Sequence, residues 1–357
     1  MKEWKKYKLG EILTVKYGKD HKKLDAGSIP VYGSGGLMRF VNSYICDSPS
    51  ILIPRKGSLN NVMYVEHPFW TVDTMFWTII DTTIAVPRFV YYAICKIDFE
   101  SLNVGSAVPS MTVPIIEDIE IFLPSLNEQK RIVKVLSSLE SKIELNRQIN
   151  DNLEQQASSI LSDWTSTYPC RTYKLSDICK YVSAKCDTGN LTSQNYISTE
   201  NMLPNKKGIV DASNIPTGKV TCFKVDDILI ANIRPYFQKI WKADTSGGCS
   251  TDVLCIRSCV ESHSPILYWI LHQDAFFEYV MTGAKGCKMP RGDKQHIMNW
   301  TIDLPEPDYW ADIATQLGAV DQRIAYNRIE SNNLSNLRDT LLPKLMSGEL
   351  KINEIDC

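Results

Sequence analysis

Two short polar runs of this sequence carry side chains whose donors and acceptors suit the edges of nucleic-acid bases. Both runs follow segments rich in β-branched residues, which predict strands. The first run offers Arg55, Lys56, Ser58, Asn60 and Asn61. The second run offers Arg234, Tyr236, Gln238 and Lys239. Farther along the chain, Lys288 and Arg291 stand beside Pro290. Arginine or lysine pairs with guanine in a groove, and asparagine or glutamine pairs with adenine. The alternative is two solvated loops whose charges keep the protein in solution.

Motifs of several enzyme classes are missing from the sequence. The glycine-rich stretches 33–36 and 283–286 lack the Gly-Lys-Ser/Thr of a phosphate-binding loop. The five histidines form no helical pair, and neither Gly-x-Ser-x-Gly nor an Asn-Pro-Pro-Tyr-like tetrad occurs. No catalytic residue is therefore assigned, and the sequence favours binding over catalysis.

Five other residues could carry chemistry, but a structural role is the better interpretation for each. Asp73 and Asp252 stand in similar surroundings, where a repeated turn or sheet-edge hydrogen bond is the simpler role. Cys255, Cys259 and His263 are evenly spaced, as in a zinc cluster, but a fourth ligand at motif spacing is missing. No metal site is therefore predicted.

The sequence also contains an internal repeat. One constant shift without gaps aligns Leu123-Pro124 with Leu304-Pro305 and Asn146-Arg147 with Asn327-Arg328. The same shift aligns Gly105 with Gly286 and Pro109 with Pro290, and a shorter one aligns Tyr7-Lys8-Leu9 with Tyr173-Lys174-Leu175. The repeat predicts two similar domains, each followed by a similar helix, and hence two similar binding events.

The repeated segments carry an apolar stripe that recurs every three or four residues, as in a coiled coil. In the first copy the stripe is Leu136, Leu139, Ile143, Asn146 and Leu153, and in the second copy it is Leu317, Val320, Ile324, Asn327 and Leu334. Ser125 and Glu128 have the spacing of a helix-capping box. The matched asparagines favour two helices packed on each other, with each asparagine seeking an asparagine partner; the alternative is that each helix packs on its own domain. Pro343 is expected to break or kink the second helix.

These observations predict an α+β chain in which two globular domains are separated by two long helices that form an antiparallel coiled coil. The predicted boundaries are residues 1–124 for the first domain, 125–164 for the first helix, 165–305 for the second domain, and 306–357 for the second helix and tail. Short helices are expected at Pro87–Ile97 and Ser264–Met281. Strands are expected at Ser50–Ile53, Thr78–Ile80, Asp227–Ile230 and Asp252–Ile256.

Composition describes an ordinary soluble chain of 357 residues without a membrane-spanning apolar run or a signal-peptide core. Its eleven scattered cysteines indicate reduced thiols and a cytoplasmic location. The net charge of −2 is unusual for a protein that binds DNA alone. A local basic cluster comprises Lys2, Lys5, Lys6, Lys8, Lys16, Lys19, Lys22 and Lys23. If the ligand is DNA, either the basic groups gather on one face of the protein or a partner subunit supplies much of the phosphate contact.

Along nearly its full length the chain resembles the specificity subunit of type I restriction–modification systems. The resemblance rests on segments 29–36, 53–58, 227–235 and 250–252, on the first helix start at Leu123–Val133, and on the tail segment Leu337–Leu350. The second helix start, Pro305–Trp310, departs from the pattern because it lacks the Glu-Gln pair present at Glu128-Gln129. That departure leaves open how alike the two partner-docking surfaces are.

The resemblance implies a non-catalytic subunit that recognises a bipartite DNA target, one half-site per domain, with the helices setting the spacer. It implies two modification subunits carrying an S-adenosylmethionine-dependent adenine methyltransferase. It also implies restriction subunits carrying an ATP- and Mg-dependent translocase and nuclease. No cofactor is expected in this chain. Two rival functions stay open: a coiled-coil scaffold that binds only protein, and a self-sufficient DNA nuclease or methyltransferase.

Overall fold

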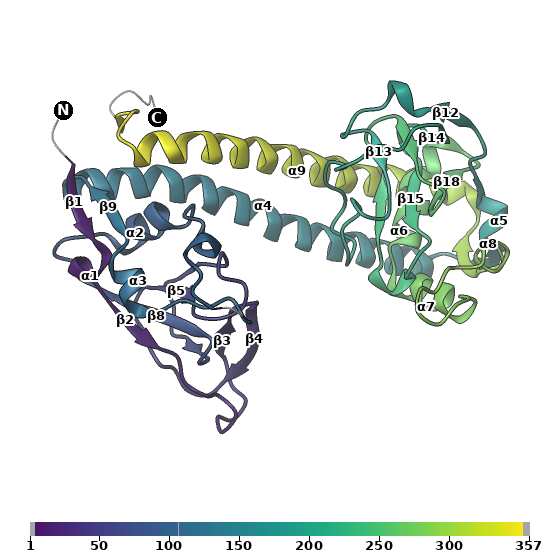
Figure 1. Ribbon diagram of the computed structural model, residues 1–357. Helices are drawn as coiled ribbons and strands as arrows, with labels where there is room; N and C mark the ends of the chain where they lie inside the picture. The colour runs from purple at the N-terminus through teal and green to yellow at the C-terminus, as the bar shows by residue number, and fades with distance from the viewer. Residues whose placement is uncertain (1–3, 106, 353–357) are drawn as a thin grey trace. The chain divides into compact units, whose positions relative to one another are not determined.

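The structure is a computed structural model that describes residues 4–105 and 107–352, so Lys2 and the tail residues 353–357 lie outside the described part. The chain forms two compact units. Unit 1 comprises Met1–Glu144 and Asn332–Cys357, and unit 2 comprises Leu145–Ser331. Both boundaries fall inside the long helices α4 (Leu126–Thr167) and α9 (Trp310–Met346), so each unit holds a part of both helices (Figure 1).

Unit 1 is built from three small sheets and short helices. Its elements before α4 are β1 (Lys5–Lys8), α1 (Leu9–Ile12), β2 (Leu13–Tyr17), β3 (Ile29–Gly33), β4 (Gly36–Val41), β5 (Ser50–Pro54), β6 (Met63–Val65), β7 (Trp70–Thr71), β8 (Met75–Ile80), α2 (Pro87–Ile94), the 3-10 helix η1 (Phe99–Leu102), α3 (Val113–Glu117) and β9 (Glu120–Leu123). The sheets have the strand orders β2-β8-β5-β6, β4-β3-β7 and β1-β9. The strand β5 is buried along its whole length, and its residues Ile51 and Ile53 lie in the main core beside Phe76 and Phe89.

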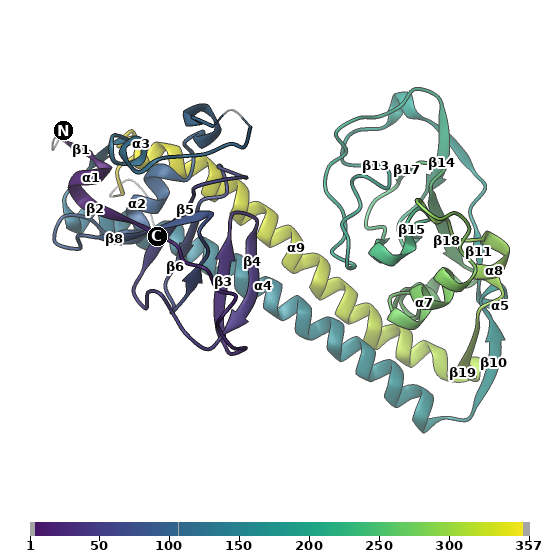
Figure 2. The same ribbon diagram turned by 60° about the horizontal axis from the view of Figure 1, so that its bottom comes forward.

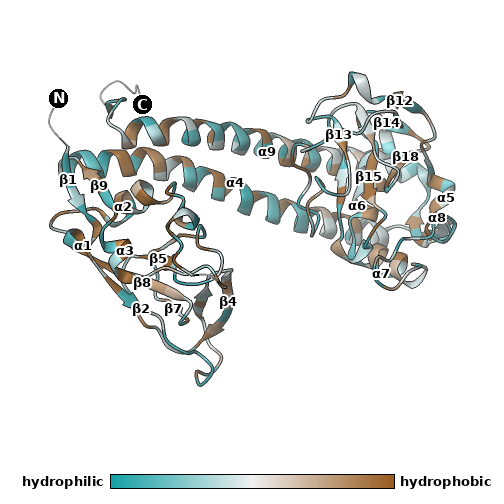
Figure 3. Ribbon diagram, viewed as in Figure 1, coloured by the Kyte–Doolittle hydropathy of each residue, from teal (hydrophilic) through white to brown (hydrophobic). Residues whose placement is uncertain are grey.

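Unit 2 contains a sheet of the same strand order in its own core. Its elements between α4 and α9 are β10 (Cys170–Lys174), α5 (Leu175–Ile178), β11 (Cys179–Tyr181), β12 (Lys185–Asp187), η2 (Thr188–Asn190), β13 (Tyr196–Ile197), β14 (Lys219–Phe223), β15 (Ile228–Ala231), η3 (Pro235–Phe237), β16 (Ile240–Lys242), β17 (Gly247–Cys249), β18 (Val253–Ser258), η4 (Glu261–His263), α6 (Ser264–Leu271), α7 (Asp274–Thr282), α8 (Lys294–Met298), β19 (Thr301–Pro305) and η5 (Pro307–Tyr309). The order β11-β18-β15-β16 parallels β2-β8-β5-β6. The buried strand β15 appears brown in Figure 3, as its apolar sequence requires.

The way each unit joins its helix is alike in both units. A first strand pairs antiparallel with the strand that precedes the helix, β1 with β9 and β10 with β19. The next residue then donates a backbone hydrogen bond across the sheet, Leu9 N to Ile119 O and Leu175 N to Trp300 O, both 2.8 Å. A carboxylate two residues later caps the short helix that follows, with Glu11 accepting from Lys8 N and Asp177 from Lys174 N.

Within unit 2, α4 and α9 lie side by side and run antiparallel (Figure 2). Trp164 of α4 packs against Trp310 of α9, and Asn146 lies beside Asn327, so residues pair in opposite order. Both asparagines are buried. The sequence led us to expect asparagine partners. Asn327 Nδ2 does bond to Asn150 Oδ1 at 2.8 Å, but Asn146 Nδ2 bonds to Glu330 Oε2 at 2.7 Å.

Within unit 1, the same two helices contribute to the core that contains β5. Leu136 of α4 and Leu345 of α9 are fully buried in this core. Of the break or kink predicted at Pro343, the break does not occur, since α9 runs through Pro343 to Met346. Burial of Leu342 and Leu345 on either side of the proline outweighs the hydrogen bond that the proline removes.

The other predicted elements are present, with one correction. The four predicted strands correspond to β5, β8, β15 and β18, of which β15 and β18 begin one residue later than predicted. The helix expected at Pro87–Ile97 is α2, which ends at Ile94. The single helix expected over Ser264–Met281 is two helices, α6 and α7. Gln273 adopts an extended conformation with φ −69° and ψ 148°, so the second helix starts again at Asp274. The chain is a mixture of helix and sheet with a 42-residue helix, α4.

Candidate nucleic-acid interface

In unit 1 the polar run directly follows the central strand β5 and is held by main-chain contacts. Met111 N donates to Arg55 O at 2.9 Å, and Gly57 N donates to Pro109 O at 3.1 Å. Gly57 has a φ of +89°, a left-handed conformation that glycine adopts at little cost. A Cβ at this position would lie 2.9 Å from the Ser34 Oγ atom. We call residues 55–61 the unit 1 turn.

The side chains of the unit 1 turn divide into engaged and available groups. Arg55 is half-buried: its Nη1 donates to Asp73 O at 3.1 Å, and its guanidinium lies over the Tyr17 ring. Asn60 Nδ2 donates to Asp98 Oδ1, and Asn61 Nδ2 donates to Ser34 O. The available candidates are Lys56 and Ser58, whose side chains are exposed and make no hydrogen bond or ion pair to another described residue.

A hollow of about 670 Å³ adjoins the unit 1 turn. Its lining residues are Asp20, His21, Lys22, Gly33, Ser34, Gly35, Met38, Val72, Asp73 and Thr74. It meets the turn at Ser34, which accepts the bond from Asn61, and at Thr74, whose carbonyl accepts from Arg55 N. Lys22 could not be placed beside this turn from the sequence, because only the fold brings these distant segments together.

In unit 2 the corresponding turn is held by the same pattern of main-chain bonds. Gly292 N donates to Asn232 O at 3.1 Å, and Arg234 N donates to Pro290 O at 2.7 Å. The turn η3 then bends back to Gln238. Both Arg234 and Gln238 have left-handed backbones, with φ of 52° and 50°. Residues 234–239 are called the unit 2 turn.

The loop that contains Asn205 and Lys206 holds the last residues of the unit 2 turn through main-chain hydrogen bonds. Asn205 N donates to Phe237 O at 2.8 Å, and Lys206 N donates to Gln238 O at 2.9 Å. The Lys206 ammonium also pairs with Asp274 at 2.6 Å, at the start of α7. These bonds fix the backbone of the unit 2 turn before any ligand arrives.

The unit 2 candidates also divide into engaged and available side chains. Lys239 Nζ donates to Thr199 O at 2.6 Å, and burial lowers the pKa of this lysine. Arg291 pairs with Asp252 at 3.1 Å, and the Gln238 side chain lies beside Asp274. The available candidates are Arg234, Tyr236 and Lys288, whose exposed side chains make no hydrogen bond or ion pair to other parts of the described chain.

The remaining candidates for chemistry have local roles. Asp73 uses its backbone carbonyl to hold Arg55, and Asp252 uses its carboxylate to hold Arg291. Cys255 is buried with its Sγ 3.6 Å from Asp227 Oδ2, whereas His263 packs its ring on Trp310. Across residues 4–105 and 107–352, no three histidine, cysteine or acidic side chains gather closely enough to hold a metal ion, and no helix is long and apolar enough to span a membrane.

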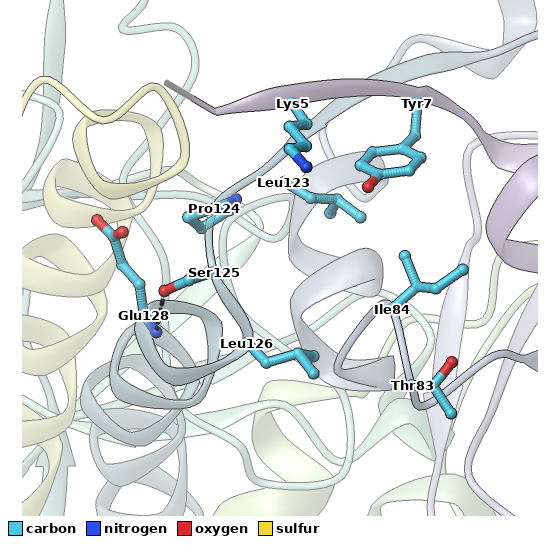
Figure 4. Close-up of a pocket in the computed structure, with 9 residues that line it drawn as sticks. All are labelled: Lys5, Tyr7, Thr83, Ile84, Leu123, Pro124, Ser125, Leu126 and Glu128. Carbon is cyan, nitrogen blue, oxygen red and sulfur yellow. Dashed lines mark hydrogen bonds between the residues drawn. The ribbon is translucent and has the colours of Figure 1, made fainter. Parts of the chain in front are cut away.

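The start of α4 borders a second hollow, of about 490 Å³ (Figure 4). At the rim, Ser125 Oγ accepts a hydrogen bond from Glu128 N at 3.4 Å, as the capping-box spacing predicted. Gln129 is fully buried: its Nε2 donates to Pro124 O at 2.9 Å, and its Oε1 accepts from Val86 N. At the start of α9, Trp310 Nε1 donates to Pro305 O at 2.8 Å. At the start of α9, Trp310 thus takes the role that Gln129 has at the start of α4, since each side chain donates to a proline carbonyl. Both side chains are buried, so neither forms an exposed docking surface.

Comparison with known proteins agrees with this geometry. Residues 1–155 match the family described as "Type I restriction modification DNA specificity domain". The Type I restriction enzyme MjaIX specificity subunit of Methanocaldococcus jannaschii is 20% identical over 340 residues, covering 86% of this chain and 78% of that protein. The EcoDI specificity subunit of Escherichia coli is 22% identical over 409 residues, covering 98% and 89%.

The fold has a counterpart among solved structures. The S subunit of a type I restriction–modification system from M. genitalium has a TM-score of 0.62 at 18% identity, with 96% of each chain covered. The domain match over the first 155 residues and the likeness of both relatives over most of the chain point the same way. The chain is therefore similar to the specificity subunits of type I restriction–modification systems over most of its length, and its residues 1–155 match the specificity domain itself.

Proposed function

We propose that this chain recognises a bipartite DNA target, and that the unit 1 turn and the unit 2 turn each contact one half-site. The observation that carries the proposal is the agreement between the two turns. Each follows the strand that is second from one end of a four-stranded sheet, and each is tied by the same pair of main-chain bonds to a segment with a matched proline. Exposed donors without partners in the described residues stand at both places.

The proposal includes the domain arrangement. Residues 1–124 and 165–305 are then two target-recognition domains of common origin, and residues 125–164 and 306–357 form an antiparallel coiled coil with a tail. The coiled coil sets the number of base pairs between the half-sites. Support comes from the matched strand orders and from the Asn146–Glu330 and Asn327–Asn150 hydrogen bonds between α4 and α9 in unit 2.

The chain acts as a non-catalytic member of a larger cytoplasmic complex. Two modification subunits supply the S-adenosylmethionine-dependent methyltransferase, and restriction subunits supply the ATP- and Mg-dependent translocase and nuclease. The net charge of −2 supports shared binding, because neutralisation of phosphates provides much of the affinity for DNA. The isolated chain should bind duplex DNA weakly, with selectivity appearing in the complex.

The decisive experiment is co-purification on a tagged copy of the chain from its own host, followed by mapping of methylated bases. We expect a methyltransferase to co-purify and the modified adenines to lie in one two-part sequence with a fixed spacer. Methylation or cleavage by the chain alone would make it an enzyme in its own right. A complex without any sequence preference on DNA would instead make the chain a protein-binding scaffold.

A further inference from the structure

Arg234 occupies a backbone position that the architecture gives to glycine in the other unit. Gly57 and Arg234 each donate a main-chain hydrogen bond to a proline carbonyl, and these prolines, Pro109 and Pro290, are matched in the sequence repeat. The residues that precede Gly57 and Arg234 also correspond, since Lys56 forms a β-bridge with Ser110 and Ile233 forms one with Arg291. Both positions have a left-handed backbone, with φ of 89° at Gly57 and 52° at Arg234.

An arginine is costly at this position. Side chains with a Cβ disfavour the left-handed region, and the following Pro235 restricts the backbone of Arg234 further. Unit 1 demonstrates that glycine fulfils the same backbone role. The structure of the turn therefore does not explain why an arginine is present, and the explanation must lie in its side chain.

The Arg234 side chain is also free to bind a ligand. It is exposed, and within the described ranges its guanidinium has neither a hydrogen bond nor an ion pair. The nearby Arg291 differs in this respect, because Asp252 already holds it. The turn that carries Arg234 is pre-organised by the bonds from Asn205 and Lys206, so little order has to be gained on binding.

We infer that Arg234 determines specificity in the second half-site by donating two hydrogen bonds to one guanine base. This inference rests on the proposed function and assigns it a single residue. A planar guanidinium presents two parallel N–H donors in a rigid arrangement that matches the O6 and N7 acceptors of guanine in the major groove, whereas a lysine ammonium is a point charge on a flexible stem. A contact with phosphate would not need two parallel N–H donors held at a fixed position, because a mobile lysine on an unstrained backbone would serve.

The test uses the complex co-purified on the tagged full-length chain and a pool of random-sequence duplex DNA, with sequencing of the retained fraction. Arg234→Gly removes the side chain and relieves the backbone. We expect the preference for one guanine–cytosine pair to fall by roughly 5- to 150-fold, the worth of one bidentate contact, with all other positions unchanged. Arg234→Lys should restore the affinity in part but not the preference. The thermal midpoint of Arg234→Gly should stay level or rise.

The matched control is Asn205→Gly. Asn205 is exposed and also left-handed, with a φ of 55°, and its bond to Phe237 O uses only the backbone. Glycine keeps this N–H, so the thermal midpoint of Asn205→Gly should also stay level or rise, and the variant should select the wild-type sequence.

Three results would overturn the inference. The first is an unchanged preferred sequence for Arg234→Gly. The second is an equal loss at all positions that Arg234→Lys fully repairs, which marks a phosphate contact. The third is a lowered thermal midpoint for Arg234→Gly, which marks a structural residue. If the wild-type complex selects no sequence, the proposed function itself fails. If it selects a two-part sequence that Arg234→Gly retains, only the role of Arg234 fails.

Discussion

The two units share a backbone framework and differ in the side chains placed on it. The same main-chain bonds join β1 to β9 and β10 to β19, and the same bonds hold the two turns. At the start of the long helices, however, Gln129 in one unit and Trp310 in the other satisfy a proline carbonyl. A framework fixed by main-chain bonds tolerates such replacements, as the proposed recognition of two different half-sites requires.

The central strand of each unit shows a second difference. In unit 1, Ser50 at the start of β5 donates to Thr78 O at 2.8 Å and accepts from Thr78 N at 3.0 Å. In unit 2, Asp227 just before β15 is buried and pairs with Arg257 through two bonds of 2.6 Å. Both contacts tie the central strand to its neighbour, β8 or β18, but only the second uses buried charge.

The largest effect is expected when the two long helices are made unequal. Four residues inserted between Glu144 and Leu145 alone should abolish selective methylation, because α4 then loses register with α9. The same insertion there and between Ser331 and Asn332 should restore it and lengthen the spacer by one or two base pairs, since four helical residues add about 6 Å and a base pair spans about 3.4 Å. Methylation mapping decides: an active, doubly extended protein with the original spacer would show that the helices do not set the distance.

The buried charge of unit 2 should make its central strand more sensitive than that of unit 1. Asp227→Ala leaves Arg257 without its carboxylate and should lower the free energy of unfolding by about 3 kcal/mol. Ser50→Ala removes only neutral hydrogen bonds and should cost about 1 to 2 kcal/mol. Urea unfolding of both variants measures the difference. Equal losses would mean that the ion pair contributes no more than the hydroxyl.

Acid should destabilise the chain partly through His272 of unit 2. Burial, and then the charges of Lys206 and Arg328, lower the pKa of His272 to about 3 in the folded chain. The unfolded imidazole takes up a proton near pH 6.5. Between these values the unfolded chain binds more protons, so stability falls as the pH drops from 6.5 toward 3, by about 2 kcal/mol at pH 5. His272→Gln should show a shallower loss between pH 7 and pH 5 in urea unfolding, and an identical slope would contradict this account.

The smallest effects are expected at the helix starts. Trp310→Phe retains an aromatic ring in the core beside Trp164 but leaves Pro305 O without its donor, at a cost of about 1 kcal/mol. Gln129→Leu deprives both Pro124 O and Val86 N of a partner and should cost more, about 2 kcal/mol. Thermal unfolding tests the ranking. A larger loss for Trp310→Phe would mean that the tryptophan contributes mainly by its size.

Local patterns in the sequence account for the elements that were predicted correctly. Burial on one face explains the apolar spacing over α4 and α9. Burial on both faces explains the apolar runs of β5 and β15. The sequence did not exclude a break at Pro343 because the rule for proline is local, whereas burial of Leu342 and Leu345 depends on segments far away in the chain.

The candidate sites could be predicted only as residue runs. The sequence does not reveal that Asn60 and Asn61 are engaged by Asp98 and Ser34, because these partners come from distant loops. It also gives no backbone angle for Arg234, which follows from a hydrogen bond to Pro290 more than fifty residues later. The sequence likewise does not reveal that Trp310 has the same role in unit 2 as Gln129 has in unit 1, since both roles depend on where the side chain points.

One selection experiment tests the central claim, that each unit recognises its own half-site. The tagged complex would be offered random duplex DNA as the double variant Lys56→Ala/Ser58→Ala and, separately, as Arg234→Ala/Lys288→Ala. We expect that the first variant alters only one half of the selected sequence and the second alters only the other half, with the spacer unchanged in both. Changes by either variant in both halves together would contradict it.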